Sequence, residues 1–175
     1  FSRSIALDVL GNVYITGSFQ GTVDFDPGPG VYNLSVATFP PSYLYSVQDM
    51  FICKLDANGG FVWAKQLAGN GHSQSISITI DASGNVYTTG RFQATTDFDP
   101  GVGIFNLSAY GAIPFYDIFI SKLDANGNFV WAKNIGGPAG AGALSNTNAG
   151  HTITVGPLGN IYVTGCFSGT ANFSS

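Results

Sequence analysis

Alternating apolar and small residues open each of three similar stretches of the chain. Such alternation is typical of a β-strand that turns one face inward. A longer run, rich in β-branched and aromatic residues, follows each of them and favours a second strand. The first runs cover 4–8, 77–81 and 152–156, and the second runs cover 12–19, 85–92 and 160–167.

Two further runs complete a predicted four-stranded antiparallel unit. They cover 49–56 and 61–67 and recur at 117–124 and 129–135. Each pair is joined by Asp-Ala-Asn-Gly, a hairpin signal in which Asn and Gly are expected to supply the positive φ angles. Their apolar residues are consecutive rather than alternating, so both faces of the unit need cover. No stretch shows a 3.6-residue period, and no helix is expected.

The same order of strands repeats along the chain. "GNVYITGSFQGTVDFDPG" begins at Gly11, returns with few changes at Gly84, and returns in part at Gly159. Sheets that neighbours cover on both faces occur in β-propellers, which close with about four to eight blades. We therefore predict an all-β fold of four-stranded antiparallel propeller blades, about two and a half of them, in one segment of a single propeller or repeat array. The repeats are expected at 1–69, 70–137 and, incomplete, 138–175.

Composition limits the partners of such a protein. Charged residues make up 9% of the chain, the net charge is −4, and the six Lys plus Arg are scattered singly. Nucleic acid and anionic membrane surfaces both require a basic patch, so neither is an expected partner. No apolar run approaches the roughly 18 residues of a membrane helix, so no membrane insertion is expected. The chain begins at Phe1 without a signal sequence, which indicates a processed or partial chain.

The ten acidic residues are all aspartates, in five pairs at equivalent positions of the first two repeats. Acids that recur with the repeat provide no unique carboxylate pair for acid–base catalysis, so no catalytic residues and no enzyme activity are predicted. Four of these aspartates lie in the predicted tight turns, where their side chains should accept backbone hydrogen bonds. They are Asp8, Asp56, Asp81 and Asp124.

The other six aspartates form two sets that could bind calcium. The insertions "VDFDPG" and "TDFDPG", together with the strand that resumes after each, should place three carboxylates on one face, and calcium prefers six to eight oxygen ligands. The alternative is that Asp-Pro-Gly makes an ordinary turn without a metal. Calcium is therefore the one candidate cofactor. Its candidate ligands are Asp24, Asp26 and Asp49 in the first repeat and Asp97, Asp99 and Asp117 in the second.

Other conspicuous residues favour structural roles. Cys53 and Cys166 are replaced in the other repeats, which favours free thiols over a disulfide. His72 and His151 do not occupy equivalent strand positions and are expected to be exposed in loops. Aromatic residues that recur once per repeat are expected in the core or between blades, although a sugar-binding platform would look the same in sequence. These are Trp63, Trp131, Tyr14, Tyr87 and Tyr162.

The repeat resembles a known family. "LD..GNVY.TG.F", then "D.FI.KLD.NG.FVWAK", then a glycine-rich join to the next "D..GN", is similar to the bacterial β-propeller repeats known as SBBP repeats, over nearly the whole chain. The resemblance implies a propeller in a large secreted or surface-anchored prokaryotic protein, and so an extracellular or cell-surface location. The "DFDPG" insertion resembles versions in surface proteins of Bacteroidetes-like bacteria. The family brings no catalytic residues with it.

Two functions agree with these patterns. The first is a non-catalytic structural or adhesive module of a larger surface protein or self-assembling structure. Its partners would be further repeats of the same chain or copies of itself, because strands apolar on both faces need covering. The second is a propeller that binds a surface glycan or protein in a calcium-dependent way through the two aspartate sets.

Overall fold

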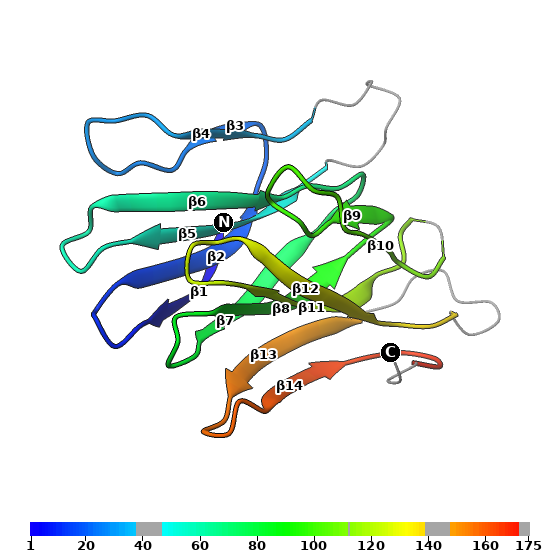
Figure 1. Cartoon of the computed structure of the whole chain (residues 1–175). Coiled ribbons are helices and arrows are strands. Elements are labelled where there is room, and N and C mark those ends of the chain that lie inside the picture. Colours follow the sequence, from blue (N-terminus) through cyan, green and yellow to red (C-terminus); the bar gives the residue numbers. More distant parts are fainter. Residues whose placement is uncertain (38–46, 112, 139–147, 172–175) are drawn as a thin grey trace.

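The computed structural model describes residues 1–37, 47–111, 113–138 and 148–171, and the regular elements of these ranges are all β-strands (Figure 1). Blade 1 is an antiparallel sheet in the order β1 (Ser2–Leu7), β2 (Val13–Phe19), β5 (Asp49–Leu55), β6 (Phe61–Leu67). Blade 2 repeats it with β7 (Gln74–Ile80), β8 (Val86–Phe92), β11 (Asp117–Leu123) and β12 (Phe129–Ile135). In blade 3, β13 (Ala149–Val155) pairs with β14 (Ile161–Cys166). The predicted all-β fold of about two and a half blades is confirmed. Within the described ranges, no helix is long and apolar enough to cross a membrane.

The tight hairpins of all three blades have the same turn geometry. In the first of them the Asp8 carbonyl accepts the Gly11 N–H at 3.0 Å, and the Asp8 N–H donates to the Asn12 carbonyl at 3.1 Å. This is a type I turn followed by one left-handed residue, and the φ of Gly11 is 82°. Because that geometry needs a positive φ at one position alone, the asparagine that precedes the glycine in Asp-Ala-Asn-Gly does not adopt it. The expectation that Asn shares this role is wrong.

Successive blades pack face to face. β7 contacts both β1 and β13, and Figure 1 shows the sheets as layers that follow one another from blue through green to orange. A buried cluster joins blades 1 and 2 and contains Tyr14, Ile52, Ile78, Val86 and Leu123. Blade 2 is therefore covered on both faces, which explains why its strands are not cleanly amphipathic.

An inserted hairpin lies in each of the first two blades. It comprises β3 (Thr22–Asp24) with β4 (Asn33–Ser35) in blade 1, and β9 (Thr95–Asp97) with β10 (Asn106–Ser108) in blade 2. The hairpin folds back over its own sheet: Phe98 is fully buried, and its ring centroid lies 5.1 Å from that of Phe119. The same cluster includes Met50 and Leu67 of blade 1. The β9–β10 hairpin thus fills space between two blades.

The recurrent tyrosines are buried where the blade around them is complete, and the recurrent tryptophans are half-buried. Tyr14 and Tyr87 are 0% and 4% exposed, and each packs edge-on against the half-buried tryptophan of its own blade, Trp63 or Trp131. Tyr162 is 57% exposed, because β13 and β14 alone leave its ring uncovered. The core prediction holds for the first two tyrosines and is wrong for the third.

The cysteine prediction is confirmed and the histidine prediction is half right. Cys53 and Cys166 are not joined in a disulfide. His151 is exposed, as expected, but it lies on β13 rather than in a loop. His72 is half-buried, because the backbone on either side of it pairs with Gln48 of the neighbouring sheet.

Candidate functional site

The loop between β6 and β7 closes the joint between blades 1 and 2. Its Ala68 carbonyl accepts the Asp97 N–H at 2.8 Å, and its Asn70 N–H donates to the Thr95 carbonyl at 3.0 Å. The loop therefore adds a short extra strand to the edge of the β9–β10 hairpin, with an antiparallel bridge at Gly69. This backbone pairing fixes the loop of one blade to the insertion of the next.

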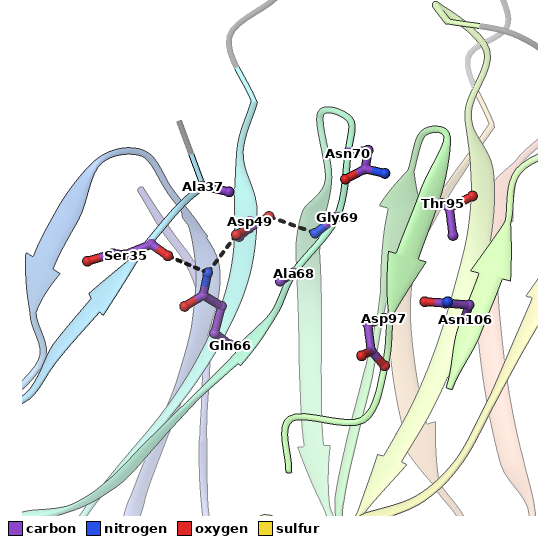
Figure 2. A pocket seen from close by; sticks show the side chains of 10 residues that line it. All are labelled: Ser35, Ala37, Asp49, Gln66, Ala68, Gly69, Asn70, Thr95, Asp97 and Asn106. Atoms are coloured by element: carbon purple, nitrogen blue, oxygen red, sulfur yellow. Dashed lines mark hydrogen bonds between the residues drawn. The ribbon is translucent and has the colours of Figure 1, made fainter. Parts of the chain in front are cut away.

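A polar pocket of about 310 Å³ lies at this joint (Figure 2). Blade 1 contributes a carboxylate and an amide to its wall, and the insertion of blade 2 contributes another of each. None of the lining residues is basic, so the pocket offers mainly hydrogen-bond acceptors and amide groups. Its polar side chains include Ser35, Asp49, Gln66, Asn70, Asp97 and Asn106.

Asp49 is built into the wall of this pocket and is 1% exposed. Its Oδ2 accepts a hydrogen bond from Gln66 Nε2 at 2.6 Å, and its Oδ1 accepts the Gly69 N–H at 2.9 Å (Figure 2). The same Gln66 nitrogen donates to the Ser35 carbonyl at 3.0 Å. Burial raises the pKa of Asp49, and the hydrogen bonds from Gly69 and Gln66 offset part of that rise.

Asp117 occupies the same place in blade 2 with poorer contacts. It is 0% exposed, and its Oδ2 accepts the Tyr110 N–H at 2.9 Å and a long 3.5 Å bond from Asn134 Nδ2. Its Oδ1 is buried without a hydrogen-bond partner in the described part of the chain. Burial raises the pKa of Asp117 as well, with partial compensation from Tyr110 and Asn134.

This difference predicts opposite effects for one substitution at two equivalent sites. Asp117→Asn should stabilise the fold at pH 7 by about 1 kcal/mol, because it removes the charge of a buried carboxylate whose Oδ1 accepts no hydrogen bond from the described residues. Asp49→Asn should destabilise it by about 1 to 2 kcal/mol, because an amide N–H₂ would face one of two existing donors. Urea unfolding of both variants at pH 7 measures the two values. Equal effects of the same sign would contradict the assignment.

The aspartates of the insertions act within their own loops. Asp24 Oδ1 accepts the N–H groups of Asp26 at 3.0 Å and Tyr32 at 2.8 Å, and Asp26 Oδ1 accepts that of Gly28 at 2.7 Å. The second repeat preserves every one of these bonds, at Asp97 and Asp99. These hydrogen bonds are those of an ordinary turn that aspartate side chains stabilise.

The structure does not assemble either predicted calcium set. Asp24 and Asp26 lie beside Phe51 and Leu55 of their own blade, whereas Asp49 lies in the pocket that faces blade 2. That pocket brings Asp49 together with Asp97, which belongs to the other set. In the described part of the chain, no three acidic, histidine or cysteine side chains group as a metal site would need. Calcium binding stays a prediction.

The strands that meet at this joint carry the sequence of a known repeat. Residues 62–91 match the SBBP β-propeller repeat. The matched segment begins in β6, crosses the joint, and continues through β7 into β8. The matched segment therefore straddles two blades, and the loop that closes the joint lies inside it.

A second comparison also finds a repeat protein. The chain is 25% identical over 131 residues to an uncharacterized WD repeat-containing protein of Acanthamoeba polyphaga mimivirus, a match that covers 67% of this chain and 9% of that protein. The chain thus spans a small part of the relative's length. Together the two matches support a propeller-type repeat module, a fold that by itself names no ligand.

The amides of the pocket were not found from the sequence. Gln66, Asn70 and Asn106 come from a strand, a loop and an inserted hairpin, and they meet only because two blades pack together. One signal was available for Gln66, since Asn134 keeps an amide at the equivalent position of the next repeat. Both amides donate to the aspartate that opens the neighbouring strand, Asp49 or Asp117.

Proposed function

We propose that the chain is a non-catalytic structural or adhesive segment of a larger extracellular or cell-surface propeller, and that further blades are its partners. An exposed apolar flank on β1 carries this proposal. Ile5 is 65% exposed, whereas the isoleucines at the same place in the next two blades, Ile78 and Ile153, are 5% and 3% exposed. Ile78 is buried because it packs in the cluster that joins it to blade 1. Ile5 presents the same side chain to a side that no described residue covers.

The backbone of the insertion supports a blade as the occupant of this flank. In blade 2, the Asp97 N–H and the Thr95 carbonyl pair with the preceding blade's loop. The matching groups in blade 1 are the Asp24 N–H and the Thr22 carbonyl, and neither pairs with a described residue outside its own hairpin. A preceding repeat, or a second copy of this chain, offers the complementary loop.

The hairpin tips support an adhesive role for the same segment. Val31 is 71% exposed in the first insertion, and Val102 and Ile104 are 108% and 76% exposed in the second. Exposed apolar side chains that recur at the tips of successive hairpins form a row suited to contact with a surface protein or glycan. This contact surface is separate from the flank on β1.

Sedimentation velocity over rising protein concentration tests the role of the flank. The chain should associate, and Ile5→Asp should weaken this association about 10-fold or more, since burying one isoleucine contributes about 1.5 to 3 kcal/mol. Leu158→Asp is the matched control, because it changes an exposed apolar side chain in the turn between β13 and β14, away from both the flank and the hairpin tips.

Two measurements decide whether the flank on β1 needs a partner and which chain supplies it. A chain that stays monomeric and folded at high concentration, with or without Ile5→Asp, would show that the flank needs no partner and would overturn the proposal. If association does occur, the denatured mass of the natural polypeptide tells whether the partner blade belongs to the same chain or to another copy.

A further inference from the structure

Both arginines of this acidic protein are on β-strands of adjacent blades, and Arg91 is held in an unusual way. It lies on β8, half-buried, and its Nε and Nη2 both donate to Gln74 Oε1, at 3.1 and 2.9 Å. Its guanidinium carbon lies 4.5 Å from the centroid of the Tyr116 ring. Within the described residues these hydrogen bonds go to a neutral amide rather than to a carboxylate. The positive charge is therefore positioned but not neutralised.

His72 lies beside this guanidinium. Its Nδ1 is 3.3 Å from the Tyr116 hydroxyl, and the two rings meet edge to face. Burial first, then the charge of Arg91 and, to a smaller extent, that of Arg3, lower the pKa of His72. Two cations thus raise the local potential around one imidazole, although the whole chain has a net charge of −4.

Arg3 is the bulged residue of β1, since the register with β2 shifts between Ser2 and Ser4. A bulge re-aims a side chain away from the regular alternation of a strand. The Arg91 cluster, defined as Arg3, His72, Gln74, Arg91 and Tyr116, therefore combines the bulge of β1, the segments just before β7 and β11, and the strands β7 and β8.

The residues of this cluster are not repeated at the equivalent positions of the other blades. Where Arg91 and Gln74 pair in blade 2, blade 1 has Ser18 and Phe1, and blade 3 has Cys166 and Ala149. The position of Tyr116 is occupied by a glutamine in the first repeat.

We propose that the Arg91 cluster binds an oxyanion, the sulfate, phosphate or carboxylate group of an acidic ligand. The guanidinium edge not used by Gln74 offers a planar set of donors to two oxygens, and His72 and Arg3 add a donor and a second charge. Tyr116 and Gln74 hold the guanidinium in place before the ligand arrives, which lowers the entropy lost on binding.

Sulfate titration of the 175-residue chain, at constant ionic strength set with chloride, tests the proposal by NMR. The chain has only two arginines and two histidines, so their side-chain resonances are readily resolved. Sulfate should shift the Arg91 Nε–H and the His72 ring signals together and saturably, while the His151 signals stay unchanged. Acetate in place of sulfate distinguishes a preference for carboxylates from one for tetrahedral anions.

Arg91→Gln should weaken the His72 response at least 10-fold, and Arg91→Lys should weaken it less because the charge remains. Lys133→Gln is the control, since it removes one positive charge from the exposed face of β12 and should leave the response intact. Shifts in the wild-type chain that grow linearly and never saturate would overturn the proposal, whatever the variants do. So would an equal loss in Arg91→Gln and Lys133→Gln, because only net charge would then matter.

Discussion

Gly90→Ala should destabilise the protein by about 3 kcal/mol or more, because there is no room for a side chain between β8 and β7. A Cβ at this position would collide with the carbonyl oxygen of Gln74 and would lie 3.0 Å from the Ile76 nitrogen. Both are backbone atoms of the neighbouring strand, so neither can move without breaking the sheet. Chemical denaturation, followed by tryptophan fluorescence, measures the loss.

Gly59→Ala is the control that separates close approach from backbone conformation. Gly59 has φ 84° and nothing within 4 Å of its Cβ position, so alanine there should cost only about 1 to 2 kcal/mol for the left-handed conformation. If the two variants lose the same stability, the strand contact at Gly90 is not the cause. The equivalent glycines Gly17 and Gly165 meet the carbonyls of Phe1 and Ala149 in the same way, which explains why the repeat keeps Thr-Gly in its second strand.

The glycine contact shows what the sequence could and could not predict about the fold. Strands and tight turns follow from local patterns, and the turns at Asp8 and Asp81 were found because aspartate and glycine act within five residues. The bulge that brings Gln74 onto Gly90 has no such local signal, since Ser75, Ile76 and Ser77 read as an ordinary strand. Gly90 was the one sequence feature that indicated this close approach of β7 to β8.

The candidate site was less predictable because its residues come from different repeats. The sequence suggested that Asp24, Asp26 and Asp49 gather within one unit. Instead, each insertion folds back over its sheet, driven by burial of an aromatic residue such as Phe98, and Asp97 of the second insertion meets the preceding blade. Asp49 and Asp97 therefore share a pocket although the repeat gave no reason to pair them. Contacts between blades depend on packing geometry, which hydrophobic periodicity does not encode.

Asp81→Ala should destabilise the protein by about 3 kcal/mol at pH 7, since it removes four hydrogen bonds to one carboxylate. Its Oδ1 accepts the N–H groups of Ser83 and Asn85, both at 2.9 Å, and its Oδ2 accepts Asn85 Nδ2 at 2.8 Å and the Tyr87 hydroxyl at 3.0 Å. Asp56→Ala is the matched control. Asp56 makes the same turn with two such bonds alone, to Asn58 and Gly60, so its loss should be about half as large.

Acid should reduce the effect of Asp81→Ala. Burial alone would raise the pKa of Asp81, but the hydrogen bonds from Asn85, Tyr87 and Ser83 outweigh it and hold the pKa below the ordinary 3.8. A carboxylate with a lowered pKa stabilises the fold above the unfolded pKa, and this contribution is lost as pH falls through the folded value. The stability difference between wild type and Asp81→Ala should therefore be constant from pH 7 to about pH 5 and shrink below about pH 4. A difference at Asp81 that stays the same down to pH 2 would mean that the carboxylate charge contributes nothing to the turn.

The buried Asp117 should behave in the opposite sense, because burial raises its pKa. The stability that Asp117→Asn adds at pH 7 should therefore shrink as the pH falls and the wild-type carboxylate is protonated.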